Sequence, residues 1–139
     1  MASIFELGAI PGGLLPRQMK LTTVTNGITL STDNSYNVIV HGTPGAGGAT
    51  YTTATAAAII AHIGGDCAVG TTYMMVVLNF EGTGNVITVK GGSGVNVSGV
   101  ATIGAKASKI FIGRVTNVTK GSEAITLFGL GETAAATAN

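Results

Sequence analysis

Apolar and polar residues alternate with a period of two along most of this chain, which is the pattern of half-buried β-strands. Glycine, asparagine and serine interrupt the alternation at short intervals, and these residues favour turns. Asn26-Gly27, between the first two segments, is typical of a tight hairpin turn. The expected strands are Lys20 to Val24, Ile28 to Leu30, Tyr36 to His41, Thr72 to Phe80, Val86 to Lys90, Val95 to Val97, Val100 to Ile103, Ser108 to Val118 and Ala124 to Phe128.

One segment has helical spacing instead. Residues 53–63, TATAAAIIAHI, are rich in alanine, and their larger apolar residues recur on one helix face. Thr53 or Thr55 can cap the first turn, and Gly64-Gly65 ends the helix.

Many short strands with a single interrupting helix predict a mainly β fold. We expect an antiparallel β-sandwich or a small, jelly-roll-like barrel with one short α-helix near residues 53–63, in preference to a parallel sheet. A length of 139 residues fits one domain, which we place at residues 19–130. An extended arm over residues 1–18 precedes it, and a flexible tail over residues 131–139 follows.

The expected arm is apolar but contains Pro11, Gly12-Gly13 and Pro16, which prevent a long helix and favour an extended path. Its large apolar side chains are too hydrophobic to lie in water, so we expect them to dock on a partner or on their own domain. A first strand and loop of the same domain is the alternative interpretation. The expected docking residues are Ile4, Phe5, Leu7, Ile10, Leu14 and Leu15.

The chain carries little charge: 9% of its residues are charged and 45% are hydrophobic, with 22 glycines. An ordinary soluble domain has about 25% charged residues, which form a repulsive, hydrated surface. The low charge therefore indicates that much of the exterior is pressed against other copies or a larger assembly. A structural protein fits this composition better than a free enzyme does.

The same composition excludes several partners. A net charge of +1 with scattered basic residues gives no field for a nucleic acid, and no segment has the length of a membrane helix. The lone cysteine, Cys67, forms no intramolecular disulfide, and the N-terminus lacks the basic region of a signal peptide. These features favour assembly in the cytoplasm.

Candidate chemistry is sparse, and we predict no catalytic residue, no metal site and no cofactor. The glycine-rich stretch Gly42 to Gly48 is followed by Ala49-Thr50 instead of the Lys and hydroxyl of a phosphate-binding loop, so we interpret it as a loop of no fixed shape. Gly91 to Gly94 opens no helix and is interpreted as a turn. The acidic residues show no pairing by sequence.

His62 is followed by Asp66 and Cys67 across the expected helix terminus, a set that can hold a metal or a reactive thiolate. The favoured interpretation is structural. A histidine near a helix C-terminus is stabilised by the helix dipole, and a lone cysteine is commonly a small buried apolar group. The other histidine, His41, has no ligand at a recognised spacing.

From the alanine-rich helix onward, the order of elements resembles the small β-rich decoration, or cement, proteins of viral capsids of the tailed-phage type, and related head-fibre and tail-fibre modules. The resemblance depends on Val69-Gly70 before a long strand ending at Asn79, the turn Gly91 to Val95, and the segment Thr116 to Ala124. It includes no catalytic residue, and it does not extend to the arm before residue 20.

The resemblance implies a non-enzymatic virion protein, made in the host cytoplasm, that bridges major capsid subunits on the capsid surface, as a trimer. Deletion of residues 1–18 is then expected to leave the domain folded and to abolish capsid binding. A head- or tail-fibre domain that binds a host receptor or glycan is the alternative. A small enzyme is the third hypothesis, and it would require a metal-binding pocket at His62, Asp66 and Cys67.

Overall fold

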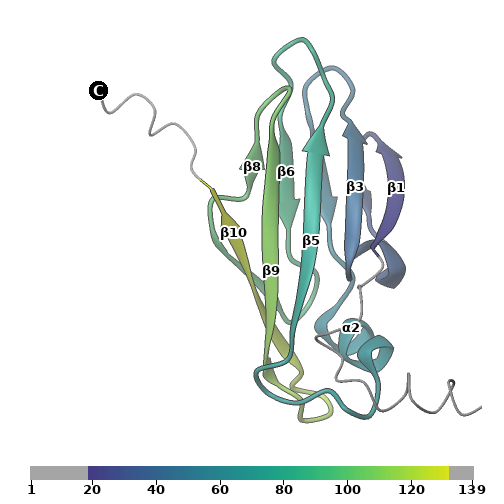
Figure 1. Cartoon of the computed structure of the whole chain (residues 1–139), viewed down its shortest axis with the longest axis vertical. Coiled ribbons are helices and arrows are strands. Elements are labelled where there is room, and N and C mark those ends of the chain that lie inside the picture. The colour runs from purple at the N-terminus through teal and green to yellow at the C-terminus, as the bar shows by residue number, and fades with distance from the viewer. Residues whose placement is uncertain (1–18, 132–139) are drawn as a thin grey trace, which may run out of the picture.

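The structure is a computed structural model, and it describes residues 19–131. Within them two β-sheets pack together around one core, and the helix lies at one end of the sandwich (Figure 1). Sheet A contains six strands in the order β1-β3-β5-β9-β10-β7, and sheet B contains four in the order β2-β4-β6-β8. The predicted mainly β, sandwich-like fold with one short helix is confirmed.

The strands of sheet A are β1 (Lys20–Thr25), β3 (Val38–Thr43), β5 (Thr72–Asn79), β7 (Val95–Gly99), β9 (Ser108–Asn117) and β10 (Ala124–Leu130). Those of sheet B are β2 (Ile28–Thr29), β4 (Ala49–Thr52), β6 (Ile87–Lys90) and β8 (Thr102–Ile103). The helical segments are η2 (Thr32–Asn34) and α2 (Ala56–Ile63).

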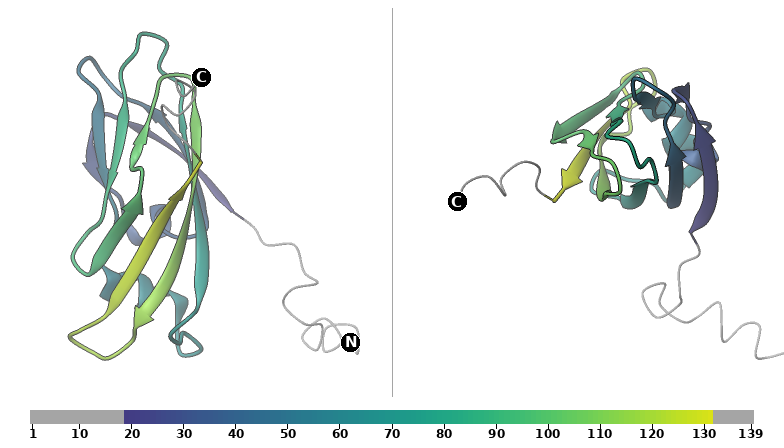
Figure 2. Two further views of the ribbon diagram at one scale, coloured as in Figure 1. Left: turned by 90° about the vertical axis from the view of Figure 1, so that its left-hand side faces the viewer. Right: turned by 90° about the horizontal axis from the view of Figure 1, so that it is seen from above.

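Strand direction differs from the prediction. From β1 to β6 the chain alternates between the two sheets, so β1, β3 and β5 are parallel neighbours in sheet A, and β2, β4 and β6 are parallel neighbours in sheet B (Figure 2). Antiparallel pairs involve only β9 and β8: β9 lies between β5 and β10, and β8 pairs with β6. Because β7 and β10 are also parallel, the expectation of an antiparallel sandwich was wrong for most strand pairs.

The turn at Asn26-Gly27 shows why the pairing was missed. Asn26 has a φ of 62°, so the dipeptide supplies the left-handed backbone that the sequence predicted. The strands on either side belong to different sheets, however, and the turn joins sheet A to sheet B instead of closing a hairpin. An Asn-Gly pair specifies the local backbone, but it does not specify which sheet the next strand joins.

The helix forms where its composition predicted it. Thr55 is the N-cap, and its side-chain oxygen accepts a hydrogen bond of 3.2 Å from the Ala58 N–H. Ala56 and Ile59 are fully buried against the sheets. The helix ends at Gly64, whose φ of 96° is strained for any residue with a side chain.

Two buried tyrosines lie across glycines that belong to strands. Tyr51 covers Gly42, where an added Cβ would lie 3.0 Å from the ring, and Tyr73 covers Gly113, where it would lie 2.2 Å away. Gly42 is a buried residue of β3, so the expectation that the loop begins there is corrected to a strand that continues to Thr43. The glycine is needed because it leaves room for the Ile87 methyl group, which lies nearest, and for the Tyr51 side chain, not because the chain turns.

We expect removal of the two tyrosine hydroxyls to change the free energy of unfolding in opposite directions. Tyr51 donates a buried hydrogen bond of 2.9 Å to the Val24 carbonyl, whereas the buried Tyr73 hydroxyl has no hydrogen-bond partner within residues 19–131. Burial raises the pKa of both, so both stay neutral at ordinary pH. We expect Tyr51→Phe to lower the free energy of unfolding by about 1 kcal/mol and Tyr73→Phe to raise it by about the same amount. Urea denaturation checks both, and a loss in both variants would contradict the assigned partners.

Candidate interaction surface

The outer face of sheet A carries a solvent-exposed apolar patch in the described part of the chain. Strand β5 shows the arrangement: Tyr73, Met75 and Val77 point inward and are buried, while Met74 and Val76 alternate with them and point outward. The outward phase of a half-buried strand is ordinarily polar. In β5 both phases are apolar.

One row of apolar residues crosses five strands in register. The row consists of Leu21, Ile39, Val76, Ile110 and Leu130. Its outer members are the most exposed, since 67% of Leu21 and 47% of Leu130 is accessible to water, and the central Ile110 is 42% accessible. Paired side chains in such a row lie in contact, so the row forms a continuous apolar ridge.

A second row lies beside the first. Met74, Ile112 and Phe128 are register partners on β5, β9 and β10. With strands ~4.8 Å apart, the patch extends about 19 Å across the sheet. We call these eight residues the apolar face: Leu21, Ile39, Met74, Val76, Ile110, Ile112, Phe128 and Leu130.

Charge is almost absent from this side of the molecule. In the described residues, the outward positions of β1, β3, β5, β9 and β10 include one charged residue, Arg114. The neighbouring Lys109 points inward and is 5% exposed, and its ammonium donates a 3.0 Å hydrogen bond to the Val100 carbonyl. Burial lowers the pKa of Lys109. A partner covering the apolar face would therefore have few ions to dehydrate.

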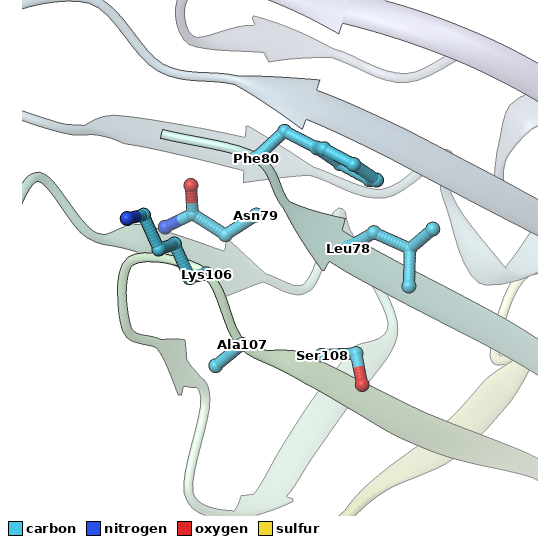
Figure 3. Close-up of a pocket in the computed structure, with 6 residues that line it drawn as sticks. All are labelled: Leu78, Asn79, Phe80, Lys106, Ala107 and Ser108. Carbon is cyan, nitrogen blue, oxygen red and sulfur yellow. The ribbon is translucent and has the colours of Figure 1, made fainter. Parts of the chain in front are cut away.

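A hollow of about 430 Å³ adjoins the apolar face where β5 ends (Figure 3). Phe80 is 61% exposed there, and its ring centroid lies 4.1 Å from that of His41. The Asn79 amide in its wall donates to the carbonyls of Asn85 and Ile103, so its N–H groups are already used within the fold. The residues lining the hollow are Leu78, Asn79, Phe80, Lys106, Ala107 and Ser108.

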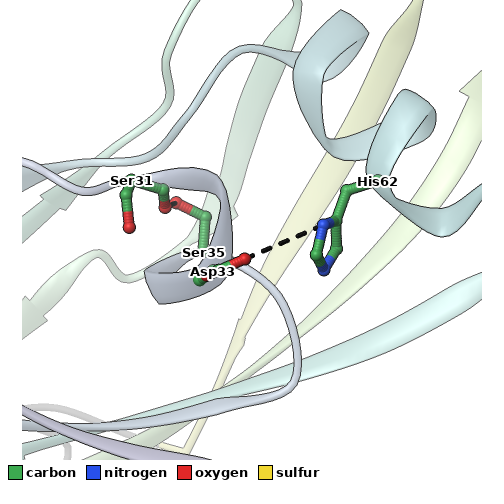
Figure 4. Close-up of polar contacts among 4 residues, drawn as sticks. All are labelled: Ser31, Asp33, Ser35 and His62. Carbon is green, nitrogen blue, oxygen red and sulfur yellow. Dashed lines mark hydrogen bonds and ion pairs between the residues drawn. The ribbon is translucent and has the colours of Figure 1, made fainter.

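His62 faces Asp33, an acid from a different segment of the chain. Its Nδ1 lies 3.8 Å from the Asp33 Oδ1, and the two side chains are 41% and 63% exposed (Figure 4). The aspartate belongs to η2, whose end is held by a 2.9 Å hydrogen bond from the Ser35 hydroxyl to the Ser31 carbonyl. Tyr36 packs edge-on against the imidazole at 5.4 Å. An exposed pair of this kind stabilises a protein little.

The hypothesised set of His62, Asp66 and Cys67 does not form a metal centre in the structure. No group of three or more histidine, cysteine, aspartate or glutamate side chains placed to hold a metal occurs within residues 19–131. Cys67 is half-buried and packs against the hydrophobic core, as expected for a small apolar group. The metal-binding pocket that the enzyme hypothesis would require is therefore not found in this part of the chain.

Among the acids of the described residues, Glu81 accepts the most hydrogen bonds, and all of them come from its own turn. Hydrogen bonds from the Thr83 hydroxyl at 2.9 Å and the Gly82 N–H at 2.8 Å lower the pKa of its carboxyl. The carboxylate therefore stays charged and holds its own turn through its Oε1 atom.

The predicted docking residues and the observed apolar face are different parts of the chain. The docking residues lie outside the described residues; they are Ile4, Phe5, Leu7, Ile10, Leu14 and Leu15. The apolar face was missed, although the sequence contains a signal for it. Residues 73–78 and 110–112 are apolar at both phases of the alternation, which is typical of strands covered on both faces.

Comparison with known proteins adds no relative: no protein-family model, curated protein or solved structure matches this chain. In residues 19–131, no helix has both the length and the apolar character needed to cross a membrane.

Proposed function

We propose that this chain is a non-enzymatic structural protein of a virion that decorates a viral capsid, bridges major capsid subunits and stabilises the shell, acting as a trimer. The observation that supports the proposal most is the apolar face, because it presents large apolar side chains in two rows with almost no charge. A free enzyme or a solution-borne carrier would expose such a surface at the risk of aggregation.

The apolar face is large enough to contribute strongly to a specific contact. Its two rows lie two residues apart, so they span about four residues of strand at ~3.3 Å each, and a width of about 19 Å gives an area on the order of 250 Å². At ~25 cal/mol per Å², covering this area contributes about 6 kcal/mol before the costs of association. Several copies acting together on one shell multiply that contribution through avidity.

Capsid binding tests the proposal. The full chain is mixed with shells assembled from the major capsid protein encoded in the same genome, and co-sedimentation is measured. We expect saturable binding by the wild type. We also expect at least thirty-fold weaker binding by Ile110→Asp, because an unpaired carboxylate buried at the contact costs ~2 kcal/mol or more.

Thr116→Asp is the matched control, since Thr116 is exposed on the same strand and lies outside the apolar face. It should bind like the wild type, and circular dichroism should show both variants folded. Failure of the wild type to bind shells would reject the decoration function. Equal binding by Ile110→Asp would reject the apolar face as a contact on which assembly at the shell depends.

The alternative is a head- or tail-fibre domain that binds a receptor or glycan. The exposed Phe80 ring beside the hollow of Figure 3 favours it, because sugars bind to exposed aromatic surfaces. Tyr51 and Tyr73, however, are buried and leave the structure with few aromatic rings for a sugar. Binding to host envelopes, lost in Phe80→Ala, together with no binding to shells would favour this function over decoration.

A further inference from the structure

An exposed apolar surface favours contact with another apolar surface, and the chain itself contains a segment rich in apolar residues. Residues 1–18 carry six large apolar side chains among few charges, whereas residues 132–139, ETAAATAN, carry none. Of the two segments outside the described residues, the N-terminal one is therefore suited to cover an apolar surface. It carries one acid, Glu6, which is opposite in sign to Arg114 on the outward side of sheet A, and one base, Arg17, close in sequence to the start of β1.

The place where the segment joins the structure also matters. It leads into Lys20, the first residue of β1, and β1 is an edge strand of sheet A. Leu21, the next residue, begins the longer row of the apolar face. Eighteen extended residues reach up to about 60 Å. The apolar face is about 19 Å wide, so the segment is long enough to reach well beyond the sheet from which it starts.

We infer that residues 1–18 of one copy cover the apolar face of a second copy. The inference rests on the proposed function and makes the apolar face the contact between copies of the decorating oligomer, so that Ile110→Asp weakens shell binding because it breaks that oligomer. The contact joins two different surfaces, the segment of one chain and the sheet of the next. Interfaces of this type close into rings when the rotation between copies permits, and a rotation of one third of a turn gives the trimer.

Two full-length variants test the inference separately. Phe5→Asp with Leu7→Asp damages the segment and leaves the face intact, whereas Ile110→Asp damages the face and leaves the segment intact. We expect the wild type to sediment as a closed oligomer in analytical ultracentrifugation and each variant alone to sediment as a monomer. Thr116→Asp, on the same strand as Ile110 but off the face, should keep the oligomer.

An equimolar mixture of the two variants then distinguishes exchange between copies from docking within one copy. With exchange, the intact segment of Ile110→Asp binds the intact face of the other variant, and a heterodimer forms with one such contact. A mixture that stays monomeric would overturn the inference, as would a monomeric wild type or an oligomer that survives Phe5→Asp with Leu7→Asp.

The same samples separate this inference from the decoration function. An oligomer that responds to the variants as expected but does not bind shells would retain the exchange and reject the function. A monomer that binds shells would reject the exchange and retain the function.

Discussion

Replacing Gly113 with alanine is expected to lower the free energy of unfolding by about 3 kcal/mol, one of the two largest single-residue effects that we expect. Gly113 is buried in β9 directly opposite Tyr73 in β5. An added Cβ would lie 2.2 Å from the Tyr73 ring, which has 4% of its surface exposed and little room to move. Either the ring leaves its rotamer or the two central strands separate, and both disturb the core.

Thermal and urea denaturation measure the effect, which corresponds to a fall in Tm of roughly 10 °C for a chain of this length. Gly104→Ala is the control, because an added Cβ there meets nothing within 4 Å, and its change should stay within about 0.5 kcal/mol. In a Tyr73→Leu background the cost of Gly113→Ala should fall, because the clashing ring is gone. An equal cost in both backgrounds would show that the ring is not the cause.

Local chemistry made much of the fold predictable. The helix was found because Thr55, the alanines and Gly64 provide a cap, a favourable interior and an end within one segment. The strands were found because apolar residues at inward positions alternate with other residues at outward positions along most of them. Strand direction was not predictable in the same way, since it depends on whether the chain after a turn such as Asn26-Gly27 pairs within its own sheet or crosses to the other.

Glycine was the other source of error. In the sequence Gly42 appears as the start of a loop, because glycine favours turns. In the structure it lies in β3 beneath Tyr51, nine residues further along the chain. The tyrosine and the glycine that accommodates it lie on strands of different sheets, and a pattern read within a short window does not join them.

The sequence predicted that an apolar surface is covered by a partner, but it did not predict which residues form that surface. Low charge indicated that the exterior is covered by something, and that expectation led to the apolar N-terminal segment. The structure adds the apolar face, whose members come from β1, β3, β5, β9 and β10. Leu21 and Leu130 lie in one row only because register aligns the intervening strands, and register was not available from the sequence.

Asn79 gives the second large effect. Its side chain is 2% exposed, and its amide donates to the Asn85 carbonyl at 2.9 Å and to the Ile103 carbonyl at 3.0 Å. Its Oδ1 accepts from the Glu81 N–H at 3.0 Å. One side chain thus joins the end of β5, the following turn and β8, and so ties sheet A to sheet B.

We expect Asn79→Asp to lower the free energy of unfolding at neutral pH by about 3 kcal/mol, because a carboxylate faces two carbonyl oxygens and donates to neither. Burial raises the pKa of the introduced carboxyl above its unfolded value, so protonation favours the folded state and the loss shrinks as pH falls through the folded pKa. Asn96→Asp, at an exposed position of β7, is the control and should change stability by less than about 0.5 kcal/mol. Denaturation of the wild type and both variants at pH 7 and at mildly acidic pH measures the difference. A loss at Asn79 no larger than at Asn96, or one that grows on acidification relative to the wild type, would contradict the role of the amide as the tie between the sheets.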